Sequence, residues 1–168
     1  MKKAFTLIEL LVVISIIGLL ATVAVISLTQ ARVRSRDAKR LADMRQVQAA
    51  LEQYNGDYTG YPSVAAVTTL GAGTAKAICN TPSAPAGTGL KAACGIAPEQ
   101  TYIGLIPIDP TNTGSLVYAY TSYATSAKVA ASCMAGYACG WYEIAFQLEG
   151  TVGNLTAGAH AVDPNGIR

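Results

Sequence analysis

The first part of the chain is dominated by an apolar run. Residues from Phe5 to Leu28 are mostly Leu, Ile, Val and Ala, with no proline and with Gly18 as the one glycine. As a helix, this segment would be roughly 36 Å long, which is sufficient to span a bilayer. A buried core helix would be shorter and more periodic, and the apolar part of a secretory signal peptide covers only about 7–15 residues. The pattern therefore predicts a transmembrane helix over residues 5–29.

The next segment, residues 30–55, continues the helix in amphipathic form. Apolar side chains recur at steps of three or four residues, as expected for one face of a helix, at Leu41, Met44, Val47, Leu51 and Tyr54. Charged side chains lie mostly off this stripe, at Arg40, Asp43, Arg45 and Glu52. The sequence Asn55-Gly56-Asp57 predicts the end of the helix. We expect the stripe to pack against a head domain.

The remainder, residues 56–168, is rich in Ala, Gly, Thr, Ser and Tyr and predicts a small antiparallel sheet. Residues 116–124 form one predicted strand, and residues 141–148, which alternate polar and apolar side chains, form another. Two strands alone are marginal, so we expect a third from 151–168 or 101–106. The fold class is therefore α+β, with one long N-terminal helix packed against a small antiparallel sheet.

Four cysteines lie in the head, at Cys79, Cys94, Cys133 and Cys139. None is spaced as CxxC and His160 is the only histidine, so we expect no metal site of the zinc type. An even number of cysteines in a loop-rich, exported region predicts disulfides, with buried free thiols as the alternative. Of the three connectivities, which the sequence does not distinguish, the simplest pairs sequence neighbours: Cys79 with Cys94, and Cys133 with Cys139. We expect residues 63–98 to form a long loop that the first disulfide holds.

A cluster of basic residues follows the apolar run, at Arg32, Arg34, Arg36, Lys39, Arg40 and Arg45. It outnumbers Lys2 and Lys3, so the positive-inside rule alone would place the C-terminal part in the cytoplasm. The cysteines and the sparsely charged head favour export, and we expect an extracytoplasmic head. We interpret the cluster as a solvated face near lipid phosphates, with contacts to acidic neighbouring chains or to DNA as the alternative. The cluster has no interleaved aromatic residues, so nucleic-acid recognition is unsupported.

One carboxylate, Glu9, lies inside the apolar run. An acidic residue near the centre of a membrane helix costs about 2.5 to 3.5 kcal/mol, although the cost falls near the helix end. A tolerated acid at the membrane edge is therefore one explanation. The other is that Glu9 needs a cationic partner, and removal of Lys2 and Lys3 would make the α-amino group of Phe5 the nearest one. That amine could belong to the same chain or to the next subunit, which would fix the axial register of a polymer.

The N-terminal sequence resembles that of type IV pilins and type II secretion pseudopilins, through Ala4-Phe5-Thr6-Leu7-Ile8-Glu9-Leu10-Leu11-Val12-Val13-Ile14. The resemblance implies that residues 1–4 are a leader, removed by prepilin peptidase between Ala4 and Phe5, and that Phe5 is then N-methylated. It also implies that Glu9 and Phe5 act in subunit recruitment and filament register. The chain departs from the family in having Ala4 where glycine is usual. It also lacks the proline that many relatives have at the position of Ile26, which favours a continuous helix.

Two further segments resemble the major pseudopilins, namely Gln53-Tyr54-Asn55-Gly56-Asp57-Tyr58-Thr59-Gly60-Tyr61-Pro62 and Ile106-Pro107-Ile108-Asp109-Pro110. That group binds calcium near its C-terminus, and this chain has candidate oxygen ligands at Asp109, Asn112, Asp163 and Asn165. The local sequence does not match the calcium site of the group, and turn formation explains these residues well. We therefore expect no cofactor, with calcium as the lesser alternative.

Together these features predict a structural subunit, and the sequence shows no catalytic constellation. The resemblance implies a single-pass precursor in the inner membrane that becomes part of an extracellular surface filament for adhesion, motility or DNA uptake. Its partners would be other copies of its own helix, the membrane, prepilin peptidase and an assembly platform with a separate ATPase. The alternatives are a major pseudopilin of a type II secretion system and, from another class, a Sec-exported binding module.

Overall fold

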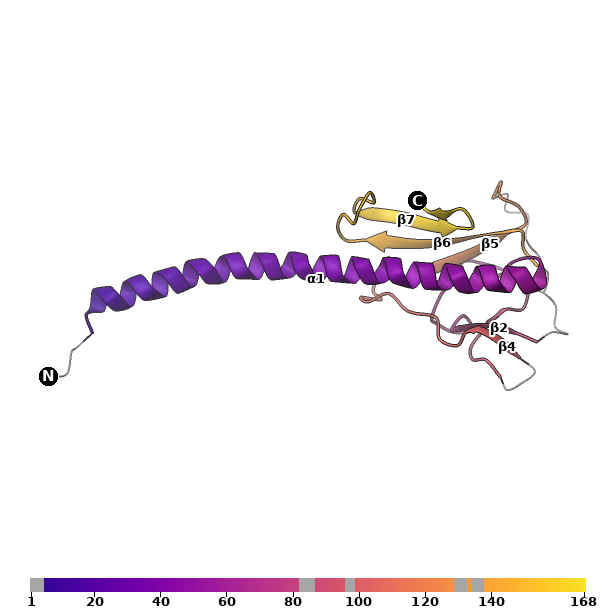
Figure 1. Ribbon diagram of the computed structural model, residues 1–168, viewed down its shortest axis with the longest axis horizontal. Coiled ribbons are helices and arrows are strands. Elements are labelled where there is room, and N and C mark those ends of the chain that lie inside the picture. Colours follow the sequence, from indigo (N-terminus) through magenta and orange to yellow (C-terminus); the bar gives the residue numbers. More distant parts are fainter. Residues whose placement is uncertain (1–4, 82–86, 96–98, 129–132, 134–137) are drawn as a thin grey trace.

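The apolar and amphipathic segments form one uninterrupted helix. The computed structural model describes residues 5–81, 87–95, 99–128, 133 and 138–168. In it, α1 (Leu7–Tyr58) contains 52 residues, which corresponds to a length of about 78 Å. The N-terminal half of α1 projects from the head as a bare rod, and the C-terminal half lies within it (Figure 1). The expectation of a continuous helix is confirmed, and Gly18 does not interrupt it.

The helix ends later than the sequence suggested. The prediction of a stop at Asn55-Gly56-Asp57 is wrong, because α1 continues to Tyr58 and is capped by Thr59 in the left-handed conformation (φ 53°). The backbone N–H of Thr59 donates to the carbonyl of Asn55 at 2.8 Å. Tyr58 stacks on Tyr54 with ring centroids 4.7 Å apart, so aromatic packing holds the last turn in place.

A five-stranded antiparallel sheet forms one part of the head, in the order β1-β5-β6-β7-β8. Its strands are β1 (Thr68–Thr69), β5 (Ala119–Tyr123), β6 (Trp141–Leu148), β7 (Gly158–Asp163) and β8 (Gly166–Ile167). The predicted hairpin is confirmed: β5 pairs with β6 with Tyr120 opposite Ile144. The expected third strand in 151–168 is β7, which pairs with β6. The strand predicted over 116–124 is shorter, since β5 begins at Ala119.

A second, three-stranded antiparallel sheet has the order β3-β2-β4. It consists of β2 (Ala77–Asn80), β3 (Leu90–Lys91) and β4 (Gln100–Ile103). The prediction that residues 63–98 form only a loop is therefore wrong, since β1, β2 and β3 all fall in that range. All four residues of β2 are buried, so this strand lacks the polar–apolar alternation by which a half-exposed strand is recognised. In Figure 1, β2 and β4 lie on one side of α1, and β5, β6 and β7 on the other.

The core of the head forms where α1 meets the sheets. The predicted stripe is confirmed, because Leu41, Met44, Val47, Leu51 and Tyr54 are all buried. Large side chains of the five-stranded sheet and the segment before it join them, among them Tyr118, Tyr120, Tyr142, Ile144 and Phe146. The prediction that charged residues lie off the stripe holds for Arg45 and Glu52, which are exposed. It is wrong for Arg40 and Asp43, which are buried.

Candidate assembly interface

The N-terminal half of α1 presents an apolar surface that the rest of the chain does not cover. Every residue from Leu7 to Leu28 is exposed, and none of the most apolar 18-residue window is buried. Large aliphatic side chains surround the helix, with Leu7 80%, Ile17 59% and Leu28 53% exposed. A surface of this kind requires lipid or other apolar helices as its environment. By length and composition, this helix is able to cross a membrane.

Three hydroxyl groups in or next to the apolar segment donate to carbonyls of the helix itself. Ser15 Oγ donates to the carbonyl of Leu11 at 2.8 Å, and Thr22 Oγ1 donates to that of Leu19 at 2.8 Å. Thr29 Oγ1 donates to the carbonyl of Val25 at 3.0 Å. Because polar groups without partners are costly in hydrocarbon, this pattern suits a helix in a bilayer or in a bundle of apolar helices.

The start of α1 is a capping box formed by Thr6 and Glu9. The backbone N–H of Thr6 donates to Glu9 Oε2 at 2.8 Å, and the Thr6 hydroxyl donates to the same oxygen at 2.7 Å. In return, the N–H of Glu9 donates to Thr6 Oγ1 at 3.3 Å. These bonds hold the carboxylate at the N-terminal end of the helix, next to Phe5, which is 76% exposed.

The role of Thr6 was not predicted, although the spacing Thr-x-x-Glu before an apolar run is the known signature of a capping box. The structure therefore gives Glu9 a partner within its own chain, but the donors are uncharged. Among the described residues Glu9 makes no ion pair. The other predicted processing residue, Ala4, lies outside the described residues.

A second group of charged residues joins α1 to the head; we call it the neck cluster, and it consists of Arg36, Asp37, Arg40, Asp109 and Glu149. Arg40 Nε donates to Asp109 Oδ2 at 2.6 Å, and its Nη1 donates to Asp37 Oδ1 at 2.6 Å and to Glu149 Oε1 at 2.7 Å. Arg36 Nε donates to Glu149 Oε1 at 2.8 Å. The interpretation of the basic cluster as a solvated face is therefore wrong for Arg36 and Arg40. It fits Arg32, Arg34, Lys39 and Arg45, which are exposed.

The neck cluster lowers the pKa values of two of its acids, Asp109 and Glu149. For Asp109, burial favours the neutral form, but hydrogen bonds from Arg40 and Thr111 outweigh it and lower the pKa to about 2. For Glu149, the hydrogen bond from Arg36 is the main cause that lowers the pKa to about 2. The hydrogen bond to Asp109 in turn raises the pKa of the Arg40 guanidinium. These groups therefore stay ionised inside the head at neutral pH, which a fully buried arginine requires.

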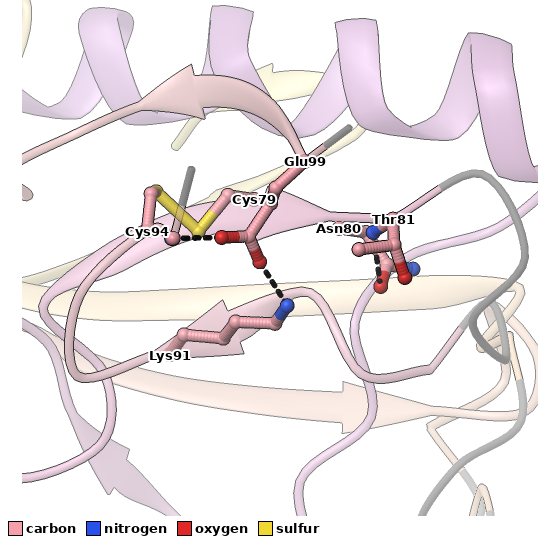
Figure 2. The surroundings of a disulfide bond; sticks show 7 residues. Cys79, Asn80, Thr81, Lys91, Cys94 and Glu99 are labelled. Atoms are coloured by element: carbon pink, nitrogen blue, oxygen red, sulfur yellow. Dashed lines mark hydrogen bonds and ion pairs between the residues drawn. A yellow bond between two sulfur atoms is a disulfide. The ribbon is translucent and has the colours of Figure 1, made fainter. Parts of the chain in front are cut away.

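The head is closed by two disulfides, and both join sequence neighbours as in the simplest predicted connectivity: Cys79 with Cys94, and Cys133 with Cys139. Figure 2 shows the first, which ties β2 to the segment after β3. Beside it Lys91 forms an ion pair with Glu99, which also accepts the backbone N–H of Gly95 (Figure 2). Cys139 also pairs with Tyr61 through two backbone hydrogen bonds of 2.8 and 3.0 Å.

The four candidate calcium ligands form turns. Asp109 Oδ1 accepts the N–H groups of Thr111 and Asn112 at 2.8 and 3.2 Å, while Arg40 occupies the same carboxylate. Asp163 Oδ1 accepts the N–H of Asn165 at 2.8 Å, and Asp163 Oδ2 lies 3.0 Å from Arg168 Nη2. The turn-forming roles predicted for these residues are confirmed. The described part of the chain contains no group of three His, Cys, Asp or Glu side chains that could hold a metal ion.

Comparison with known families identifies the N-terminal segment. Residues 1–25 match the family model described as the prokaryotic N-terminal methylation motif. This motif is the signature of type IV pilins and pseudopilins, so the resemblance stated from the sequence is confirmed. Together with the long helix on antiparallel sheets, it supports a pilin- or pseudopilin-like subunit with a membrane-anchored precursor. Comparison with curated proteins and with solved structures gave no match.

Proposed function

We propose that this chain is the structural subunit of a type IV pilus-like filament that serves adhesion, motility or DNA uptake. The proposal is carried by two features found together at the N-terminal end of α1. The methylation motif matches there, and the same segment is an uncovered apolar helix with a single carboxylate. The head supplies the outer surface of the filament and the helices supply its centre. In this proposal the protein has no catalytic activity and needs no cofactor.

Processing prepares the helix for assembly. Prepilin peptidase removes residues 1–4 by cutting between Ala4 and Phe5, and methylation follows at the new amine of Phe5. This amine carries a positive charge. Among the described residues, Glu9 has no positively charged partner. Pairing of Glu9 with the Phe5 amine of a neighbouring subunit neutralises both groups in an apolar environment, where an unpaired charge is costly. Such a pair also fixes the axial register between subunits.

Transfer from the membrane to the filament exchanges lipid contacts for helix–helix contacts. Once outside the bilayer, each large apolar side chain that neighbouring helices bury contributes roughly 1.5–3 kcal/mol relative to water. The uncovered segment has many such side chains, so the filament is stable in water although the single subunit is not. We assign extraction to a membrane assembly platform that a separate ATPase drives.

The intact mass of the mature protein from surface filaments or the membrane tests the proposal. We expect the loss of residues 1–4 and the gain of one methyl group. As a matched control, Ala4→Gly introduces the residue that the family usually has before the cut and should be processed at least as completely. A mature chain that still begins with Met-Lys-Lys would refute the proposal. A loss of about thirty residues would instead indicate a Sec-exported binding module.

The alternative within the same class is the major pseudopilin of a type II secretion system. It is favoured by the segment Ile106-Pro107-Ile108-Asp109-Pro110, which resembles that group and whose Asp109 binds the buried Arg40. Deletion of the gene distinguishes the two functions. Loss of surface filaments with normal enzyme secretion supports the pilus, and the opposite result supports the pseudopilin.

A further inference from the structure

Two arginines next to the apolar segment remain without acidic partners. Arg32 and Arg34 are exposed, and neither makes an ion pair in the described part of the chain. They differ in this from Arg36 and Arg40, which the neck cluster neutralises. Of the four arginines between positions 32 and 40, the two nearest the apolar segment therefore keep their charge available for an external partner.

The position of these arginines relative to a membrane follows from the helix. If Leu28 marks the edge of the hydrocarbon, Arg32 lies about 6 Å and Arg34 about 9 Å beyond it along α1. The polar headgroup layer of a bilayer is about 5–8 Å thick on each side. Side chains of a helix lean towards its N-terminus, here towards the membrane, and an arginine extends its charged end away from its backbone. Both guanidinium groups therefore reach the depth of the lipid phosphates.

A recess lies at the same level, between α1 and the loop that joins β6 to β7. It has a volume of about 250 Å³ and is lined by Thr29, Gln30, Val33, Arg34, Gly150 and Thr151. The loop is fixed to the helix, because the N–H groups of Glu149 and Gly150 donate to the carboxylate of Asp37 at 3.0 and 2.7 Å. Arg34 therefore lines a formed concave surface that combines a cation, polar side chains and the aliphatic Val33.

We propose that this recess binds the headgroup of an anionic phospholipid from the membrane leaflet next to the head. Arg34 pairs with the phosphate, and Gln30 and Thr151 are placed to bind its oxygens or the polar end of the headgroup. Arg32, two positions earlier and therefore on nearly the opposite side of the helix, adds attraction to other headgroups of the same leaflet. The acyl chains of the lipid lie along the apolar part of α1, so the site continues directly from the membrane-spanning surface. This lipid orients the head on the bilayer while the subunit waits for assembly.

Charge complementarity and position favour a lipid over an acidic segment of a second copy. The leaflet supplies phosphates at the depth of Arg32 and Arg34 before any other copy is present. Of the six basic residues that follow the apolar run on the exported side, against the positive-inside tendency, Arg36 and Arg40 have acidic partners in the head, and in this proposal Arg32 and Arg34 serve the headgroups. The inference rests on the membrane-anchored precursor of the proposed function.

Native mass spectrometry of the full-length chain in a neutral detergent tests the site. The protein is mixed with phosphatidylglycerol or phosphatidylcholine of the same acyl chains, and the bound lipid is counted. We expect preferential retention of phosphatidylglycerol and a loss of about fivefold for Arg34→Gln, the size expected for one basic residue at an anionic surface. The matched control is Arg45→Gln, which removes the same charge from an exposed position about 26 Å beyond Leu28, outside the range of screened electrostatics.

A second variant separates the recess from its charge. Thr151→Phe fills the recess and removes no charge, and it should also lower phosphatidylglycerol retention. Thermal unfolding of each variant shows whether its head is folded. If one of the two variants does not fold, the lipid retention of the other tests the recess. Equal retention of both lipids, or an equal effect of Arg45→Gln and Arg34→Gln, would overturn the site. Displacement of the lipid by excess inorganic phosphate would also overturn it, in favour of a simple anion site.

The failure of this inference is distinguishable from that of the proposed function. A mature protein without the first thirty residues refutes the filament and removes the basis of the lipid site. A mature protein that keeps its apolar helix but shows no preference for phosphatidylglycerol refutes only the lipid site.

Discussion

Arg40 and Asp109 are 69 residues apart in the sequence and form the central ion pair of the neck cluster, with Arg40 Nε 2.6 Å from Asp109 Oδ2. Neither side chain is exposed to solvent. The pair links the helix to the segment that leads towards β5, and Asp37 and Glu149 complete the set of acids around the guanidinium. The orientation of the head on its helix therefore depends on an electrostatic contact as well as on the apolar stripe.

Loss of Arg40 should destabilise the head strongly. Arg40→Met leaves the carboxylates of Asp37 and Asp109 buried without their cation, which costs about 3–5 kcal/mol for a broken buried pair. Guanidinium unfolding of the full chain in detergent, followed by the near-ultraviolet circular dichroism of the head, measures the change. Arg45→Met is the matched control, because Arg45 is exposed on the same helix and should change stability by less than about 0.5 kcal/mol. A small effect of Arg40→Met would show that the neck cluster does not support the head.

The neck cluster also predicts loss of stability in acid. The folded pKa values of Asp109 and Glu149 are about 2, below the unfolded values of about 3.9 and 4.3. Lowered carboxyl pKa values stabilise the folded state above the unfolded pKa, so this contribution is complete above about pH 5 and is lost as the pH falls towards 2. Burial raises the pKa of Asp43, which acts in the opposite direction and offsets part of the loss.

Urea unfolding between pH 6 and pH 2 measures this dependence. For Asp109 alone, we expect a loss of about 2–3 kcal/mol over the range. In Glu149→Gln one of the two carboxyl groups no longer titrates, so stability at pH 6 is lower but its decline in acid is smaller. Parallel curves for Glu149→Gln and the wild type would contradict the assignment.

Glu9 and Thr6 should have different effects on assembly. Glu9→Ala removes the charge proposed to pair with the Phe5 amine and should abolish filaments seen by electron microscopy. Thr6→Val removes the hydroxyl of the capping box, at a cost of about 1 kcal/mol to the helix start, but keeps the carboxylate, so filaments should persist. Thermal unfolding of the head should be unchanged in both variants. The reason is that Glu9 lies about 36 Å along the helix from Val33, which is the first residue of α1 that the head partly buries. Normal filaments in Glu9→Ala would refute the role of the charge.

The two disulfides should contribute unequally to stability. In the chain-entropy account, the loop closed by Cys79 and Cys94, with a separation of 15 residues, gives about 3 kcal/mol, and the loop between Cys133 and Cys139, with a separation of 6, gives about 2 kcal/mol. Guanidinium unfolding of Cys79→Ala/Cys94→Ala and of Cys133→Ala/Cys139→Ala compares them, each pair serving as control for the other. The reverse order would show that contacts, and not loop closure, determine their value.

The sequence determined the helical half of the molecule. A long apolar run followed by a stripe at helical spacing specifies one continuous helix with two environments, because helix formation and its apolar face depend on residues three and four positions apart. The same local information marked Glu9 as exceptional, and it contained the capping box with Thr6, which we overlooked. The strand at 141–148 was also evident, since one of its faces is buried and the other is not.

Which charged residues are internal, and where the second sheet lies, depends on contacts between distant parts of the chain. In the local sequence, Arg40 is one more member of a basic cluster. It is buried because the carboxylates of Asp109 and Glu149, which are distant in the sequence, bind its guanidinium group. The strand β2 is buried on both faces and is flanked in the sequence by small residues. It therefore has no alternation of polar and apolar side chains from which a strand could be predicted. The recess at Arg34 likewise lies between the helix and the β6–β7 loop, which Asp37 binds from the helix. Such features depend on long-range contacts, which periodicity along the chain does not encode.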